Sequence, residues 1–340
     1  MKNPILTFII LLTCWLSGYA QSECDMLFEI NKADCNRQDE KVISVSRQFL
    51  NAYPSSSLAE EVQLLIARKY FELEKLDSAR ETLNILLKIN QYNNAIDLNH
   101  VKCEHPIITF EGQYCGHTTY TMTEQAIKRE ANSLLARISS KQNNYRQALA
   151  EFDDAQKNHP YQSWCGNGIA SNAIYVAMIY ADLYKKLDET DSAINYLSPL
   201  IIDNGLANNN GLVDNLTSLL LQTQNAQTLK DSIDNSINNL QVKREIVWSN
   251  WVEEEDEETG EILQSTVTKT YGRVVYWNYL GQRYQILKTD DYASRLTYPN
   301  SSNRKKRHLK PYETDEELKA KAKRIIKTYR IYKNIENANS

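Results

Sequence analysis

The chain has 340 residues, of which 42% are hydrophobic and 24% are charged, enough for a sizeable core. A formal net charge of −4 supplies no broad cationic surface, which excludes nucleic acid as the default partner. Only 10 Gly and 7 Pro residues are present, which disfavours a glycine-rich β-sandwich or a long disordered linker. We therefore expect a mainly α-helical protein.

Residues 1–20 have the pattern of a signal peptide. Lys2 provides the positive end, residues 5–16 form an apolar run, and small residues precede the expected cleavage site after Ala20. The run is too short to cross a bilayer, which takes about 20 residues. We expect export, to the periplasm or outside the cell, with no transmembrane segment left after cleavage. Lipid anchoring through Cys14 is the alternative.

Five cysteines remain after the expected cleavage. An exported protein meets an oxidising environment in which disulfides persist. Spacing alone does not determine which cysteines pair, and an odd number leaves one thiol over. We expect that one to be the last of the five, which are Cys24, Cys35, Cys103, Cys115 and Cys165.

Three segments share one pattern of small and aromatic residues. Each copy has a small residue in a first helix and another near the start of a second helix, always 12 residues later. Two copies add an aromatic residue one turn after the first small one, where the middle copy has Ser139. Small residues are needed where two helices cross closely. The repeat positions are Ala67, Tyr70 and Ala79, then Ala136 and Ala148, then Ala181, Tyr184 and Ala193.

This pattern resembles a degenerate form of the tetratricopeptide repeat family. The resemblance implies that residues 21–242 form a TPR-like α-solenoid of stacked helical hairpins, interrupted by an insert at 91–122. It also implies binding to other proteins. An ordinary helical bundle is the alternative. We expect residues 45–52 to be the second helix of an incomplete first unit, and Asp77 and Asp191 to cap their helices.

Residues 243–340 change in character and predict an α+β extension. Alternating residues on either side of the acidic run at 253–258 predict a β-hairpin, whereas residues 274–287 fit a strand or a helix. A basic loop at 304–308 follows.

A final helix is predicted from Asp315 to Ile335. Thr314 and Glu317 have the spacing of a capping box at its start. An apolar stripe along this helix must be buried against another part of the chain.

Two Cys-x-His pairs in the insert have the ligand types of a tetrahedral zinc site. A hairpin turning near Glu111 and Gly112 would bring them together. A disulfide with incidental histidines is the alternative, and export favours it. Elsewhere we find no nucleophile, metalloprotease or phosphate-loop motif, and we expect no cofactor. The four zinc candidates are Cys103, His105, Cys115 and His117.

Together these patterns predict an exported scaffold that recognises a protein or peptide through the concave face of its repeats, rather than an enzyme. The alternatives are a periplasmic immunity protein that neutralises a toxin, and an enzyme or zinc protein with its site at 91–122. The oligomeric state is left open. The groove candidates, expected at exposed positions of the first helices, are Gln63, Lys69, Asn132, Ala177 and Asp188.

Overall fold

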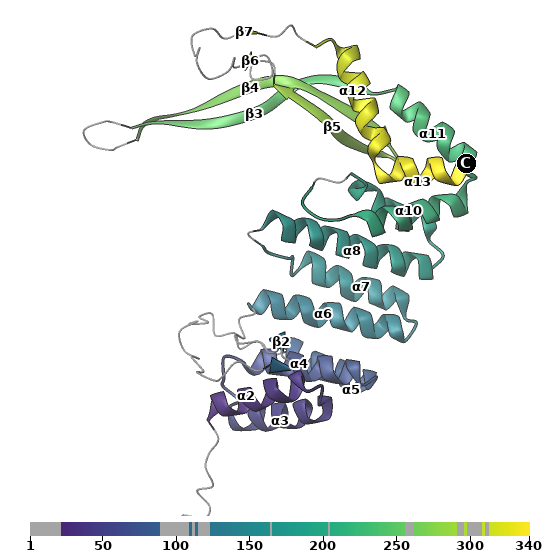
Figure 1. Ribbon diagram of the computed structural model, residues 1–340. Coiled ribbons are helices and arrows are strands. Elements are labelled where there is room, and N and C mark those ends of the chain that lie inside the picture. The colour runs from purple at the N-terminus through teal and green to yellow at the C-terminus, as the bar shows by residue number, and fades with distance from the viewer. Residues whose placement is uncertain are drawn as a thin grey trace, which may run out of the picture. The chain divides into compact units, whose positions relative to one another are not determined.

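The computed structural model describes residues 22–88, 109–110, 113–114, 123–163, 165–202, 205–255, 262–290, 296–297, 308–309 and 313–340. The predicted leader, the four zinc candidates and most of the basic loop lie outside these ranges. Within them the protein is mainly helical, with a small three-stranded antiparallel sheet near the C-terminus, which confirms the expected class (Figure 1). The chain forms two compact units, residues 1–162 and 163–340.

Unit 1 consists of helices that pack in sequential pairs. Helix α2 packs on α3, α4 on α5 and α6 on α7, while α3 also contacts α4 and α5 contacts α6. A two-stranded β-hairpin lies between α5 and α6 in the chain. The helices are α2 (Glu23–Cys35), α3 (Asp39–Ala52), α4 (Ala59–Glu72), α5 (Leu76–Lys88), α6 (Glu124–Lys141) and α7 (Tyr145–Lys157), and the strands are β1 (Thr109–Phe110) and β2 (Gln113–Tyr114).

The same turn joins the two helices of each pair, and it recurs between α8 (Gly166–Lys186) and α9 (Thr190–Leu197) in unit 2. One residue has a left-handed backbone, with φ between 54° and 61°. The backbone N–H of this residue donates to the carbonyl oxygen of the residue three positions earlier. The N–H of the following residue donates to the carbonyl oxygen five positions before itself. These bonds satisfy carbonyls that a helix end leaves free. The left-handed residues are Arg37, Glu74, Asn143 and Asp188.

The first helix pair is complete, so the expectation of an incomplete first unit is wrong. Counting from the left-handed residue, Ile30 and Val42 occupy the places of the two small residues, and both are fully buried. Because these residues are branched aliphatics rather than alanines, the alanine pattern did not reveal the first helix pair. All six predicted alanines and Tyr70 are buried, and Tyr184 is half-buried.

The predicted caps differ from the structure. Asp77 and Asp191 lie within the first turns of α5 and α9 rather than before them, and the residue preceding α9 makes no side-chain cap bond. Their carboxylates still complement the positive end of the helix dipole. The left-handed turn fixes the start of the second helix in place of a side-chain cap.

Unit 2 combines helices with a three-stranded antiparallel sheet in the order β3-β4-β5. The predicted hairpin is confirmed, and residues 274–279 and 282–287 are strand rather than helix. Leu280 and Gly281, both with positive φ, form the two-residue turn between β4 and β5. The remaining elements are α10 (Asn210–Thr223), α11 (Ala226–Asn238), β3 (Gln241–Glu255), β4 (Ile262–Tyr279), β5 (Gln282–Asp290), β6 (Leu296–Thr297), β7 (His308–Leu309), α12 (Asp315–Thr328) and α13 (Arg330–Asn339), with a 3-10 turn at Ser198–Leu200.

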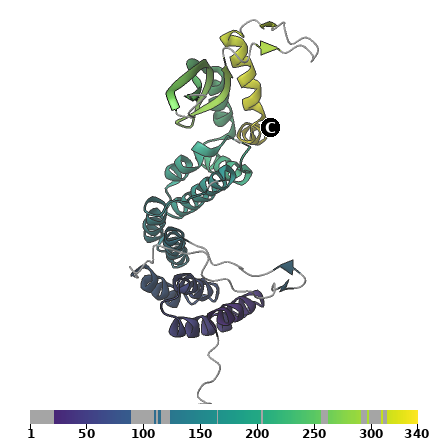
Figure 2. The same cartoon turned by 90° about the vertical axis from the view of Figure 1, so that its left-hand side faces the viewer.

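One apolar core joins the helices of unit 2 to its sheet. Trp277 is fully buried, stacks on Tyr279 at 5.2 Å between ring centroids, and donates its indole N–H to Ser236 Oγ at 2.8 Å. The same core includes Ala181 from α8 and Ile326 from α12. Helix α12 lies beside the sheet (Figure 2). The compact units divide after residue 162, while the change from helices to strands comes at Gln241, near the change that the sequence predicts at 242.

The final helix begins as predicted but is broken. Thr314 and Glu317 form the capping box. The apolar side chains Leu318, Ala322 and Ile326 are buried, as the stripe required. At Tyr329 the backbone becomes extended, with ψ of 144°, and α13 continues in a new direction, where it contacts α10 and α11.

Candidate functional site

The predicted groove residues do not form one exposed surface. Lys69, Asn132 and Ala177 are buried, so the expectation of exposed positions is wrong for these three. Gln63 is half-buried, and Asp188 is exposed in the left-handed turn after α8. Helical periodicity assigned these residues to first helices but did not show which face the neighbouring pair covers.

Lys69 holds three elements of unit 1 together. Its Nζ lies 2.6 Å from Asp34 at the end of α2, 3.1 Å from Asp39 at the start of α3 and 2.8 Å from Glu72 on its own helix. Burial alone would lower the pKa of the ammonium, but hydrogen bonds to Asp34 and Glu72 raise it well above its ordinary value. This cation is therefore structural.

Asn132 and Ser139 on α6 are also structural. The amide of Asn132 donates to Asp154 on α7 at 2.6 Å. Ser139, fully buried where the repeat pattern expects an aromatic ring, accepts from Arg80 of α5 and donates to Glu151 of α7, both at 2.6 Å. Arg80 also pairs directly with Glu151 at 2.7 Å. A polar bridge between three helices replaces the aromatic residue, which explains the departure from the repeat.

Side chains of α4 and α6 that meet across the two first helices form a patch in which charged groups that are half-buried or exposed surround one buried ring, and we call it the α4–α6 surface. It consists of Arg68, Phe71, Glu130, Arg137 and Lys141. Arg68 lies 3.3 Å from Glu130, and the cations of Arg137 and Lys141 lie 4.5 and 4.7 Å from the centroid of the Phe71 ring. Arg137 is exposed, and among the described residues its guanidinium packs against that ring. The surface thus presents an aromatic-backed guanidinium to solvent.

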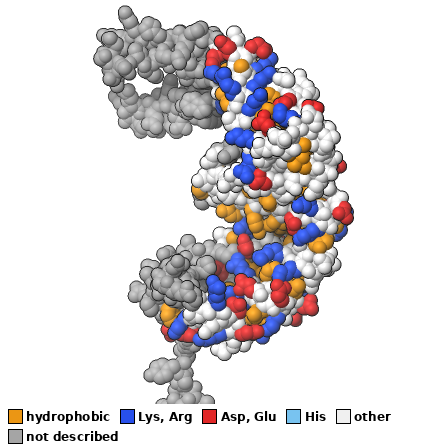
Figure 3. All heavy atoms as spheres, turned by 45° about the vertical axis from the view of Figure 1, so that its right-hand side comes forward, with side chains coloured by type: hydrophobic (Ala, Val, Ile, Leu, Met, Phe, Trp, Pro, Cys, Tyr) orange, Lys and Arg blue, Asp and Glu red, His pale blue; other side chains and the backbone are white. Residues whose placement is uncertain are grey.

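The other end of α4 carries a perturbed carboxyl group. Partial burial raises the pKa of Glu60, and repulsion from Glu124 adds to the effect, which Lys128 offsets in part. Charges of both signs are also interspersed on the face seen in Figure 3.

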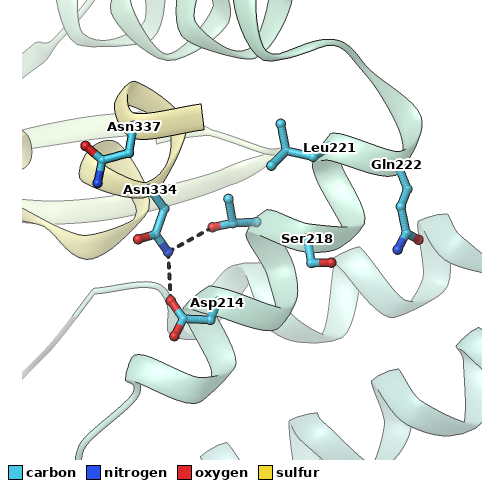
Figure 4. A pocket seen from close by; sticks show the side chains of 7 residues that line it. Asp214, Ser218, Leu221, Gln222, Asn334 and Asn337 are labelled. Atoms are coloured by element: carbon cyan, nitrogen blue, oxygen red, sulfur yellow. Dashed lines mark hydrogen bonds between the residues drawn. The ribbon is translucent and has the colours of Figure 1, made fainter. Parts of the chain in front are cut away.

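A second candidate site is a groove of about 520 Å³ between α10 and α13 of unit 2. Arg330 forms a two-pronged contact with Asp214, with both N···O distances 2.6 Å. Asn334 donates to the same carboxylate at 2.8 Å (Figure 4). These bonds hold the pKa of Asp214 below its ordinary value. The lining residues are Asp214, Thr217, Ser218, Leu221, Gln222, Asn334 and Asn337.

The groove has the chemistry of a binding site rather than a catalytic one. Its one carboxylate is already neutralised by Arg330, so it is a poor general base. The other polar lining groups are hydroxyls and amides, which bind through hydrogen bonds. The sequence analysis missed this groove because its two walls lie more than 100 residues apart, and only the break at Tyr329 brings them together.

Cys165 is a free, exposed thiol before α8, as expected for the unpaired cysteine. Backbone amides of Gly168 and Asn167 lower its pKa.

Within the described residues no group of three or more His, Cys, Asp and Glu side chains is arranged to hold a metal ion, and no helix is long and apolar enough to cross a membrane. The zinc candidates of the insert lie outside these residues.

No family model matches the chain, and no curated protein matches its sequence. Among solved structures, the chain is similar to BtubC (BKLC) from P. vanneervenii, with a TM-score of 0.40 and 16% sequence identity. That match covers 60% of this chain and 73% of the other.

Proposed function

We propose that this protein is an exported TPR-like scaffold that binds a protein or peptide through the first-helix side of its repeats. The recurrence of one helix–turn–helix geometry carries this proposal. Four pairs share the left-handed turn, its two backbone hydrogen bonds and two buried core positions on either side of it. Arrays of such pairs offer extended surfaces without a reactive centre, which suits binding.

The α4–α6 surface is the proposed contact region. Arginine, together with large aromatic residues, is enriched among the residues that dominate binding energy. Arg137 lies over Phe71, which orients the guanidinium, and no other described residue accepts a hydrogen bond from its N–H groups. We therefore expect the partner to contribute a carboxylate or a row of backbone carbonyls at this point.

The test is affinity purification of the tagged chain from the envelope of its own host. Three forms are compared: the unchanged protein, Arg137→Glu, and Lys157→Glu as a matched control on the second helix α7, where Lys157 pairs with Asp153 among the described residues. We expect one partner in stoichiometric amount with the unchanged protein and the control. Loss of a central arginine costs about 2 kcal/mol or more, so Arg137→Glu should weaken binding about thirtyfold.

Two results contradict the proposal in different ways. If no stoichiometric partner is recovered with any form, the binding function is wrong. If the partner is retained equally by Arg137→Glu and by the control, binding occurs elsewhere, and the groove between α10 and α13 becomes the next region to mutate.

A further inference from the structure

We propose that the groove between α10 and α13 binds a short, uncharged stretch of extended peptide through its main chain. The groove belongs to unit 2 alone, and its lining side chains come from these two helices (Figure 4). It is separate from the α4–α6 surface, so this inference goes beyond the binding function proposed above.

Both walls of the groove are fixed by the packing beneath them. On α10, Leu216, Leu219 and Leu220 are buried in the core of unit 2. On α13, Ile331 and Ile335 are buried in the same core. A helix anchored by its apolar positions holds the side chains of its other face at fixed spacings. The groove is therefore preformed, which lowers the conformational cost of binding.

Three polar side chains of the groove have unused hydrogen-bonding capacity. Ser218 and Gln222 on α10 and Asn337 on α13 are exposed, and no described residue pairs with their side-chain polar atoms. By contrast, Asn334 already donates to Asp214. Hydroxyl and amide side chains both donate and accept, so the three unused groups suit the N–H and C=O groups of a peptide.

The spacing along α10 matches an extended peptide. Asp214, Ser218 and Gln222 follow one another at intervals of four residues, which is about 6 Å along the helix at 1.5 Å per residue. In an extended chain, main-chain groups on the same side recur every two residues, or about 6.7 Å. Side chains on this face of α10 therefore meet alternate residues of the peptide. The distance from Asp214 to Gln222, about 12 Å, is the length of about four extended residues.

The charges of the groove favour an uncharged peptide. No lysine or arginine is among the described lining residues, so an acidic side chain would find no cation there. Asp214 already accepts two bonds from Arg330 and one from Asn334, which a basic side chain would have to displace. Leu221 is 37% exposed and offers a contact for an apolar side chain. The ligand is therefore an uncharged segment with at least one apolar residue.

The lining is less suited to a small organic molecule. The volume of about 520 Å³ lies within the range of small-molecule sites, but such sites are lined mostly by hydrophobic and aromatic side chains. Among the described lining residues of this groove, Leu221 is the one apolar side chain. A row of amides and hydroxyls suits the repeating polar groups of a main chain better.

Binding of the purified full chain to an array of blocked heptapeptides of random sequence tests the proposal. Three forms are compared: the unchanged protein, Ser218→Trp, which fills the groove, and Ser171→Trp at an exposed position of α8 that does not line it. We expect the unchanged protein and the control to bind peptides with about four consecutive uncharged residues. Ser218→Trp should lose them. N-methylation of alternate residues in the best peptide should also abolish binding, because it removes main-chain donors.

Two smaller truncations give a graded form of the same test. One side-chain hydrogen bond is worth about fivefold in affinity, so Gln222→Ala combined with Asn337→Ala should weaken the best peptide about thirtyfold. Fluorescence anisotropy with the labelled peptide measures the affinity. Both side chains are exposed, so thermal unfolding of the double variant should match that of the unchanged protein.

Several results overturn the proposal. These are no peptide bound above background, binding that Ser218→Trp leaves unchanged, a preference for charged peptides, and full binding of the N-methylated peptide. Neutral oligosaccharides that bind on a parallel array and are lost with Ser218→Trp would overturn it in favour of a sugar site. Because the array uses purified protein, its outcome is independent of the envelope purification that tests the α4–α6 surface.

Discussion

The two units are stabilised in different ways. Unit 1 has two separate apolar clusters, and charged side chains bridge its helices. Lys69 bridges α2, α3 and α4, and Arg80 bridges α5 with α6 and α7. Unit 2 has one large apolar cluster that draws on every helix from α8 to α13 and on two strands.

The two units also differ in how far apart in the sequence their contacting residues lie. Contacts in unit 1 run mostly between neighbouring helices, so one pair can loosen while others remain folded. The core of unit 2 closes only when α10 and α11 meet α13, which lies about 100 residues later in the chain, so its parts should unfold together. Hydrogen exchange followed by mass spectrometry resolves the two behaviours, since peptides from each helix are read separately.

The largest expected effect is from Trp277→Ala in unit 2. Truncating this fully buried ring leaves a cavity and orphans the Ser236 hydroxyl, which costs about 3–5 kcal/mol of unfolding free energy. Exchange should accelerate together in peptides from α8 to α13. Tyr271→Ala, at a half-exposed position of β4, is the control and should change little. Acceleration confined to the sheet would show that unit 2 is not one cooperative core.

Gly272→Ala should be nearly as damaging. A Cβ at this position would lie 1.9 Å from the Thr289 carbonyl oxygen and 2.7 Å from Val247, so β4 and β5 must separate. We expect a loss of about 3 kcal/mol, measured by urea unfolding. Gly211→Ala is the matched control, because nothing lies within 4 Å of its Cβ and alanine favours the α10 helix. Equal stability of the two variants would contradict the close strand approach.

Lys69→Met tests the local character of unit 1. Removing the cation leaves three carboxylates facing one another, and because these acids are partly exposed we expect a loss of about 2 kcal/mol. Exchange should accelerate in α2, α3 and α4 but not in α7. Lys75→Met breaks the exposed Lys75–Glu40 pair and should cost less than about 0.5 kcal/mol. Spread of the effect through α7 would mean that unit 1 also unfolds as a whole.

Ser139→Ala should have a smaller effect. It removes two hydrogen bonds but leaves the Arg80–Glu151 ion pair in place, so the expected loss is about 1 kcal/mol. Ser133→Ala on the same helix is the control. Thermal unfolding measures the stability of both variants. Equal stability of the two would show that the hydrogen bonds of Ser139 contribute nothing.

The smallest effect concerns pH and the groove of unit 2. The pKa of Asp214 is lowered in the folded state, so its contribution is full above its unfolded value of about 3.8 and is lost as the pH falls through the folded value. Because the pair with Arg330 is exposed, we expect at most about 0.5 kcal/mol. Asp214→Asn should reduce the acid sensitivity of unit 2 by that amount, measured as unfolding free energy between pH 5 and pH 3. An unchanged acid profile would show that the pair contributes nothing.

Much of the fold followed from local sequence. The alanines at 12-residue intervals marked three helix pairs, the Thr314–Glu317 box marked a helix start, and alternation marked the β-hairpin. These features depend on residues close in the chain. The first helix pair was not predicted because Ile30 and Val42 stand at the positions that alanines occupy in the other pairs, although its backbone turn is the same.

The surfaces were decided by tertiary structure. Lys69 and Asn132 have the polarity of exposed residues, yet acids on neighbouring helices draw them into buried hydrogen bonds. The groove of unit 2 needs Asp214 and Asn334, which meet only after the chain breaks at Tyr329. The sequence by itself determined helices, turns and the small residues at crossings, because each is set within a few turns of chain. Which helix faces remain exposed depends on contacting residues that lie far away in the sequence. Helical periodicity carries no information about those residues.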